Sequence, residues 1–476
     1  MKRILLVIAI ALMAGRVGAQ VQQLTLQECL KIALDNNLTV KRSVYNVETN
    51  QVNLLGAKGN FLPTLNLNGS GSQNYGRNLN PVTYQYFQGV TKTVNPSITG
   101  SVLLFNGLRN QLTYRQNRKY IDAADLDLQK AKNDVIITVV TNYTTVILNK
   151  ELFENAKFQL NSSEQTLDRI KKQVAAGALP KTNELNQEAT VATNETNLIT
   201  QENNYNLAVL TLKQSMQVPA SNQFEVVIPD IALSDMSVDK TPEEIYAMST
   251  QNLPQVKSAL LKVDAAQYAM KAARAAYYPR LSLTYAAVSN YNSASDQAQY
   301  TTVPNSVGPI GYVGSNPSDI VYSPLVPQQV KVSDSYHVDK QLQDNIYKNV
   351  GLSLSIPILN GFQTRTGVQQ AIINRELANI TVKETENTLR QSIETAYNNA
   401  VAASKTYAAA VKQVNASEEA YRMTTLRFDN GAANFVEYQI SANDLFSAKS
   451  TLSRSKFNFI LTKKILDFYE GKTIEY

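Results

Sequence analysis

The stretch "VLLFNGLRN", residues 102–110, is the clearest guide to the architecture, because a second stretch, "SIPILNGFQTR" at residues 355–365, has the same organisation. In each, alternating apolar residues end at an Asn-Gly pair, and a long polar segment with helical spacing follows. The two glycines, Gly107 and Gly361, lie at an offset of 254 (361 minus 107). An ordinary Asn-Gly hairpin would be followed by a second strand two residues later, and "LRNQLTYRQNRKY" has no strand-like alternation. The sequence therefore predicts two strands that each run into a helix.

Further repeats flank these stretches. "TLQE", from Thr25, and "TPEE", from Thr241, both have the Thr-x-x-Glu form of a capping box, which starts a helix; they lie at an offset of 216 (241 minus 25). "FLPTLNL" and "YYPRLSL" lie at the same offset, counted between Pro63 and Pro279 (279 minus 63). The chain therefore reads as two tandem copies of helix, strand, loop, strand, long helix, glycine turn and helix.

A glycine ends the long helix in each copy. The interval from Gly107 to Gly177 equals the interval from Gly361 to Gly431 (177 minus 107 equals 431 minus 361). A glycine just past a helix end commonly reverses the chain. In the first copy two interleaved seven-residue rows predict coiled-coil-like packing: Ile121, Leu128, Val135 and Asn142, and Ala124, Ala131, Thr138 and Thr145. A helix of that length spans on the order of 100 Å at about 1.5 Å per residue.

Apolar alternation predicts four strands, at about 64–75, 96–105, 280–291 and 349–358. The expected domains are a signal peptide (1–19), a first repeat (20–217), an irregular connecting segment (218–240) and a second repeat (241–476). Between the last two strands lies a long loop at 292–348. Loops of this length are usually functional or disordered.

The first residues, "MKRILLVIAIALMAGRVGAQ", have the pattern of a secretory signal. Two basic residues precede a short apolar core, and small residues ending at Ala19 form a cleavage site. The alternative, a membrane anchor, needs roughly 18 or more apolar residues, and this core stops at Gly15 and Arg16. We expect cleavage after Ala19.

Composition argues against several classes of protein. Removing the signal takes away three basic residues, so the formal charge falls from +6 to +3, which gives no reason to expect a nucleic-acid partner. The only cysteine, Cys29, has no disulfide partner, and the only histidine, His337, has no companions for a metal site. No catalytic motif is present. We therefore expect no enzyme activity, no cofactor and no resident metal.

The four strands of a secreted chain allow two interpretations. They are either an ordinary half-buried sheet of a soluble protein or part of an outer-membrane β-barrel, in which every backbone group must be paired. Small barrels need about eight strands, and four cannot close. A trimer of this chain would supply twelve. A further alternative, suggested by the helical hairpins alone, is a soluble periplasmic coiled-coil adaptor or scaffold.

In this order and spacing, the motifs resemble the TolC family of outer-membrane channels over essentially the whole mature chain. The resemblance is carried by "TLQECLKIALDNN", "FLPTLNLNGS", "LFNGLRN", "ILNGFQTR" and "RFDNGAANFVEYQISANDL". It implies a mixed, mainly helical fold. Each subunit would give four strands to a twelve-stranded transmembrane barrel of a homotrimer, and its long helical hairpins would build an α-barrel extending into the periplasm.

The resemblance also assigns expected roles to the two turns and the two tips. The barrel strands would meet the tunnel helices at the Asn-Gly pairs, Asn106 with Gly107 and Asn360 with Gly361. The tips would dock a periplasmic adaptor (membrane fusion) protein through Gly177, Ala178 and Leu179 and through Arg427, Gly431 and Ala432. The position that matches Arg427 in the first tip holds Gln173 (427 minus 254), so an arginine contact is not expected there.

Acidic rings narrow the periplasmic entrance in this family, and two residues here qualify as gate or selectivity residues. Glu437 falls on one such position, whereas Ile440 stands where a second acid often lies; Glu184 is the candidate after the first tip. Three acids in a trimer ring would favour cations. The alternative is that both acids are solvated residues in the first turn of a helix, where the helix dipole favours them.

The resemblance implies a passive exit duct that lies in the outer membrane and contacts outer-membrane lipid. Transport energy would come from an inner-membrane RND or ABC transporter, coupled through the adaptor. The duct would serve an efflux pump for small molecules, drugs or metal ions, or alternatively a type I protein secretion system. The sequence does not decide between these substrates.

Overall fold

The computed structural model describes residues 22–81, 84–228, 238–295, 299–322, 324, 326–333 and 335–472. The expected signal peptide and its cleavage site at Ala19 lie outside these residues. The chain divides into two compact units, each of which draws on both sequence repeats. The helical unit consists of Met1–Val52, Arg118–Ala266 and Asn374–Tyr476, and the strand unit consists of Asn53–Asn117 and Gln267–Ile373.

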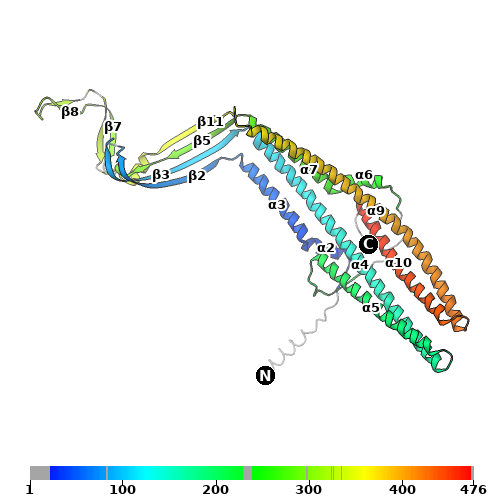
Figure 1. The fold of residues 1–476 in the computed structure, drawn as a ribbon. Coiled ribbons are helices and arrows are strands. Elements are labelled where there is room, and N and C mark those ends of the chain that lie inside the picture. Colours follow the sequence, from blue (N-terminus) through cyan, green and yellow to red (C-terminus); the bar gives the residue numbers. More distant parts are fainter. Residues whose placement is uncertain are drawn as a thin grey trace, which may run out of the picture. The chain divides into compact units, whose positions relative to one another are not determined.

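Helices make up most of the described chain (Figure 1). They are α2 (Leu26–Asn36), α3 (Leu38–Gly59), α4 (Arg109–Ala175), α5 (Lys181–Met216), α6 (Pro242–Asn252), α7 (Pro254–Arg274), η2 (Ala275–Tyr277), η3 (Ser293–Ser295), α8 (Val338–Asp344), α9 (Gln363–Asp429) and α10 (Phe435–Tyr469). Helices α4 and α9 have the same length, 67 residues each. None of the described helices is both long and apolar enough to cross a membrane.

The strands are β1 (Gln22–Leu24), β2 (Thr64–Leu79), β3 (Tyr86–Phe105), β4 (Phe224–Val226), β5 (Arg280–Val288), β6 (Tyr291–Asn292), β7 (Gln299–Ser306), β8 (Pro309–Tyr312), β9 (Ile320–Tyr322), β10 (Val326–Ser333) and β11 (Tyr347–Ser355). The segment expected as a loop at 292–348 therefore contains two antiparallel strand pairs, β7 with β10 and β8 with β9, and the short helix α8. Figure 1 shows this extension in yellow-green.

Both capping boxes form, and each starts a pair of helices where a single one was expected. The Thr25 side chain accepts from the Glu28 backbone N–H, and the Glu28 carboxylate accepts from the Thr25 backbone N–H at 2.8 Å. The helix stops before Asn37, whose backbone is extended (φ −60°, ψ 123°). The Asn37 side chain then accepts from the Thr39 backbone N–H at 2.8 Å, as an N-cap does, and α3 begins.

The second copy repeats this interruption at the equivalent position. Thr241 and Glu244 form the capping box of α6, and Leu253 is extended (φ −84°, ψ 141°). Pro254 follows Leu253, and a proline disfavours helical geometry in the residue before it. Different residues thus produce the same break in the two copies.

The helical unit is held by an apolar core around Tyr143 in α4. This side chain is almost fully buried among Leu24, Val226 and Leu212, and its hydroxyl donates to the Val227 backbone oxygen at 2.7 Å. It therefore anchors the small parallel sheet that joins β1 to β4. The predicted connecting segment, 218–240, contains β4, and its residues 229–237 lie outside those that the structure describes.

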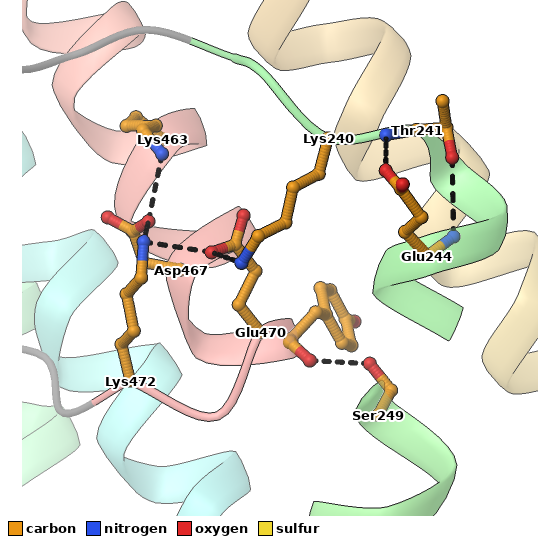
Figure 2. Close-up of polar contacts among 9 residues, drawn as sticks. Lys240, Thr241, Glu244, Ser249, Lys463, Asp467, Glu470 and Lys472 are labelled. Atoms are coloured by element: carbon orange, nitrogen blue, oxygen red, sulfur yellow. Dashed lines mark hydrogen bonds and ion pairs between the residues drawn. The ribbon is translucent and has the colours of Figure 1, made fainter. Parts of the chain in front are cut away.

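A network of charged side chains fixes the end of α10 against the start of α6 (Figure 2). The Glu470 side chain is 5% exposed and accepts from Lys240 at 2.9 Å and from Lys472 at 2.8 Å. Burial by itself opposes ionisation, but the hydrogen bonds from the two lysines outweigh it and hold the pKa of Glu470 below its usual value. Lys463 pairs with Asp467 beside them at 2.9 Å.

The strand unit is built on one antiparallel sheet in the order β11-β5-β3-β2, and β6 also pairs with β3. Strands β2 and β3 pair from Thr64–Ser101 to Leu79–Tyr86, so the hairpin is longer than the predicted strands at 64–75 and 96–105. The added part, residues 76–79 with 86–95, lacks apolar alternation and is held in the hairpin by backbone pairing. Conversely, β11 ends at Ser355 and not at 358, because Pro357 cannot donate to a ladder.

Candidate functional site

The two faces of the sheet have opposite chemistry. Successive residues of a strand point to opposite faces, and in β11 Val350, Leu352 and Leu354 share one face and are 69%, 68% and 62% exposed. They pair with Tyr285, Leu283 and Leu281 of β5, and Leu65 and Leu67 of β2 continue the same face. An exposed apolar patch that extends from β11 to β2 marks an interaction surface.

The opposite face is mainly polar, although Leu103, Ala286 and Val288 also lie on it. Its polar members are Thr64, Asn66, Asn68, Thr99, Ser101, Ser282, Thr284, Ser353 and Ser355. The Thr64 and Ser101 hydroxyls lie 3.0 Å apart, and Thr284 donates to the Gly351 backbone oxygen at 3.2 Å. One sheet thus presents an apolar face and a hydrogen-bonding face.

Both edges of the sheet are open among the described residues. Strand β2 pairs only with β3, and β11 pairs only with β5. A long exposed edge carries backbone N–H and C=O groups that are ready to pair with another chain.

The strands end at Asn-Gly turns whose geometry explains the repeated motif. Gly107 and Leu108 both have positive φ (66° and 66°), and so do Gly361 and Phe362 (59° and 64°). The Arg109 N–H bonds to the Asn106 oxygen at 3.3 Å, which closes a two-residue turn. Two consecutive positive φ values define the type I′ turn, but its central residues here are Gly-Leu and Gly-Phe, and each asparagine stands one position before them. A helix follows each turn, and the leucine and phenylalanine in left-handed geometry are features that sequence reasoning missed.

The turn asparagines help to start the helices. The Asn106 amide donates to Asn110 Oδ1 at 2.8 Å, and the Asn360 amide donates to the Thr364 hydroxyl in the second copy. Asn110 in turn donates to the Asn60 backbone oxygen at 2.7 Å. The spacing of four residues is the same in both copies and places each asparagine over the first helical turn.

Each tip is a helix end of the Schellman type. Gly177 has a φ of +77°; its N–H bonds to the Val174 oxygen at 2.9 Å, and the Ala178 N–H bonds to the Gln173 oxygen at 2.9 Å. These two bonds are the complete motif. Gly177 and Ala178 are exposed, and Leu179 is half-buried.

The second tip repeats the motif at the equivalent position of the second copy. Gly431 has a φ of +70°, and the Ala432 N–H bonds to the Arg427 oxygen at 2.7 Å. The Arg427 guanidinium donates to the Ala432 oxygen at 3.1 Å and closes the turn from the outside. Gly431 and Ala432 are exposed. Arg427 therefore holds the tip together by its own hydrogen bond.

Glu437 is the third residue of α10 and has two partners. Its backbone N–H donates to the Asn434 side chain at 2.8 Å, and its carboxylate lies 3.4 Å from the Arg427 guanidinium. Both charged side chains are about half exposed. The structure therefore brings together one predicted gate residue and one predicted docking residue as an ion pair, which the sequence did not indicate. Ile440 is exposed.

Glu184 lies in a different environment. Its residue is 8% exposed, and its carboxylate pairs with Lys181 at 2.6 Å. By the repeat offset (438 minus 184 equals 361 minus 107) it corresponds to Tyr438, which is also buried, and not to the exposed Glu437. The two predicted gate residues are thus not equivalent in the repeat.

A buried cluster joins the two tips, and sequence reasoning missed it. Ile170 of α4 packs with Phe435 and Tyr438 of α10. The Tyr438 hydroxyl lies 3.1 Å from the Tyr421 hydroxyl, and burial with this hydrogen bond raises the pKa of Tyr421 to about 12. An ion pair between Arg169 and Asp429, at 3.0 Å, closes the cluster.

No metal centre competes with these features in the described part of the chain. No three residues among its histidines, cysteines, aspartates and glutamates are grouped to hold a metal ion. Cys29 is fully buried, and burial raises the pKa of its thiol to about 12, so it is unreactive. His337 is exposed at the N-terminus of α8.

Comparison with known proteins gives a consistent result. The model of the family described as "Outer membrane efflux protein" matches residues 29–216 and 245–458. Outer membrane protein TolC of Escherichia coli (strain K12) is 20% identical over 343 residues, 71% of this chain and 62% of TolC. The match therefore spans less than two thirds of that relative's length.

Solved structures show the same fold. The crystal structure of CusC, described in terms of transmembrane channel formation, is 15% identical, covers 94% of this chain and 92% of its own, and gives a TM-score of 0.75. The outer membrane channel CmeC of Campylobacter jejuni is 17% identical, covers 94% and 84%, and gives a TM-score of 0.73. At identities this low, the TM-scores and the high coverage show the fold alone, which is mainly helical with antiparallel strands.

Proposed function

Because the chain belongs to the outer membrane efflux protein family, as its repeated motifs predicted, we propose that it is one subunit of a homotrimeric channel, the passive exit duct of a tripartite efflux pump. The observation that carries the proposal is the sheet with one exposed apolar face, one polar face and two open edges. The alternative of a soluble adaptor or scaffold is set aside, because the family is one of outer-membrane proteins.

The sheet fits a third of a membrane barrel. Four strands from each of three subunits make twelve, within the range of outer-membrane barrels. The edge of β2 would pair with the edge of β11 in the next subunit, which satisfies the backbone groups that lipid cannot. The apolar face would contact outer-membrane lipid and the polar face would line the water-filled interior. The long helical pairs, α4 with α5 and α9 with α10, would line the periplasmic part of the duct.

The duct would perform no chemistry. Energy would come from an inner-membrane RND or ABC transporter through a periplasmic adaptor that docks at the exposed tip residues around Gly177 and Gly431. Small molecules, drugs or metal ions are the proposed cargo, and the family description as efflux proteins favours these over the alternative of type I protein secretion. Glu437 remains the proposed selectivity residue, with Arg427 as its partner.

A pair of substitutions on adjacent residues of β11 tests the membrane orientation. Leu352→Arg places a charge on the apolar face, where arginine costs about 2–4 kcal/mol at the middle of a bilayer. Ser353→Arg places the same charge on the polar face. We expect the first variant to lose most of the heat-dissociable trimer from the outer-membrane fraction and the second to keep it. Equal amounts of trimer in the two variants would contradict the assignment of the faces.

The docking role of the second tip has its own test. Gly431→Val should abolish cross-linking to the adaptor and efflux while the trimer persists, because valine strains a φ of +70° and alters the exposed tip. Gly69→Ala, at an open site on β2, is the control. If the trimer itself fails to assemble in Gly431→Val, the glycine is structural and the docking role is refuted.

A further inference from the structure

A positively charged cavity lies at the end of the sheet where the strands turn into helices. Its open volume is about 570 Å³. Two arginines, Arg109 at the start of α4 and Arg280 at the start of β5, line it. The remaining lining is polar or apolar without charge: Asn60, Leu103, Asn106, Asn110, Thr113, Ala275, Ala276, Tyr278, Ser355 and Pro357.

The cavity opens on the polar face of the sheet. Arg280 pairs directly with Ser355 of β11, and the next residue on the same face of β5, Ser282, pairs with Leu103 of β3 and Ser353 of β11. Leu281, between Arg280 and Ser282, points to the apolar face. If the sheet lines a duct as proposed, Arg280 and the cavity face its water-filled interior.

No acidic residue neutralises the cavity from within its own part of the chain. Residues 53–117, 267–295 and 345–373 contain no aspartate or glutamate. In the sequence, all aspartates and glutamates of the strand unit fall within residues 296–344. Among the described residues neither Arg109 nor Arg280 has an ion pair with a carboxylate. Two unpaired guanidinium groups at one cavity are a recognised means of binding anions.

The acidic residues at the proposed periplasmic entrance would repel anions less strongly than two unpaired acidic rings would. The carboxylate of Glu437 is paired with Arg427, and that of Glu184 is buried and paired with Lys181. At the position of a second acid stands the uncharged Ile440. Glu437 and Glu184 thus each have a basic partner, which weakens the repulsion that these two carboxylates exert on an anion.

We propose that this cavity binds the carboxylate or phosphate group of anionic molecules, and that the duct accordingly accepts anionic solutes. The proposal rests on the proposed function for its account of the interior. Arg109 and Arg280 would hold the anionic oxygens in charge-assisted hydrogen bonds, and the Asn106 and Asn110 amides would set the polar rim. The exposed ring of Tyr278 offers an apolar surface beside the charge, which suits an amphiphilic anion.

Equilibrium binding tests the site without requiring transport. Purified full-length protein in an uncharged maltoside detergent is titrated with citrate and with pyrophosphate by calorimetry. We expect binding to the unmodified protein and a loss of affinity of about tenfold or more in Arg109→Gln/Arg280→Gln, because each charge-assisted pair is lost. Arg280→Lys keeps the charge and should retain most of the affinity.

A control variant removes one positive charge elsewhere on the same sheet. Lys348→Gln lies on β11 at the opposite end of the sheet, on the apolar face, and should bind like the unmodified protein. Repeating the titration with detergent-solubilised phosphatidylglycerol distinguishes the source of the anion. If citrate binds and the lipid does not, the site is assigned to soluble anions. If the lipid binds as well, and its binding needs the two arginines, the site is assigned to lipid headgroups.

The outcomes separate this proposal from the one on which it rests. Affinity that is unchanged in Arg109→Gln/Arg280→Gln, or absent from the unmodified protein, overturns the anion site even when the protein conducts ions in a bilayer. Anion binding that needs both arginines in a protein without conductance supports the site and refutes the duct. A rise in cation preference of the pore in Arg109→Gln/Arg280→Gln, absent in Lys348→Gln, supports both.

Discussion

The two strand-to-helix glycines have equal backbone geometry but different surroundings, so the same substitution should have unequal effects. Gly107→Ala would place a Cβ 2.7 Å from Tyr278 Cβ and 2.8 Å from the Ala275 backbone oxygen, closer than real Cβ atoms pack. Gly361→Ala would meet nothing within 4 Å. Both positions have positive φ, which costs an alanine about 1–2 kcal/mol. Only Gly107→Ala adds an overlap cost of about 1–3 kcal/mol.

Thermal unfolding of the detergent-solubilised protein, followed by circular dichroism, measures the difference. We expect Gly361→Ala to lower the unfolding free energy by about 1–2 kcal/mol and Gly107→Ala by about 2–5 kcal/mol. Each kcal/mol corresponds to roughly 2–4 °C in Tm for a unit of this size. Gly69→Ala, at an open site, should be close to neutral. Equal losses at the two turns would show that the contacts of Gly107 with Tyr278 and Ala275 do not constrain it.

Three more predictions concern charge, pH and packing. Arg427→Gln should raise the cation preference of the reconstituted pore and Glu437→Gln should lower it, because the two charges neutralise each other; changes in one direction for both would refute the pairing. The lowered pKa of Glu470 stabilises the fold fully above its ordinary value of 4.5, and this stability is lost as pH falls through the lowered value. Glu470→Gln should therefore lower Tm at pH 7 and flatten its acid dependence, and a parallel shift at every pH would argue against the ionised carboxylate. Ile170→Ala should cost about 2–5 kcal/mol through the cavity it leaves between the tips, and a calorimetric loss under about 1 kcal/mol would show that the cluster is loosely packed.

The sequence predicted the order of elements well, because each signal was local. The Thr-x-x-Glu boxes, the Asn-Gly pairs and the tip glycines all act within a few residues, and the structure gives them the expected caps and positive φ values. The break at Leu253 could also have been found, since Pro254 follows it. The break at Asn37 carries no such signal, because asparagine is compatible with a helix interior as well as with a cap.

The pairing of charges could not be predicted, because it depends on contacts across turns and between helices. Arg427 and Glu437 lie on two different helices, and only the Schellman turn between them brings their charges to 3.4 Å. Both Glu184 and Glu437 are acids in the first turn of a helix. Glu184 corresponds in the repeat to residue 438 and not to 437, and it therefore lies on the buried side of its helix, where its carboxylate pairs with Lys181. One residue on a helix changes the facing direction by about 100°, which sequence spacing alone resolves poorly.

Single-channel recording of the purified mature protein in a planar bilayer, with its mass in detergent determined on the same sample, tests whether the chain forms a trimeric duct. We predict a trimer that inserts and conducts ions in discrete steps of uniform size. A water-soluble monomer that never conducts would contradict the barrel, the duct and the assignment of the apolar face of the sheet to lipid.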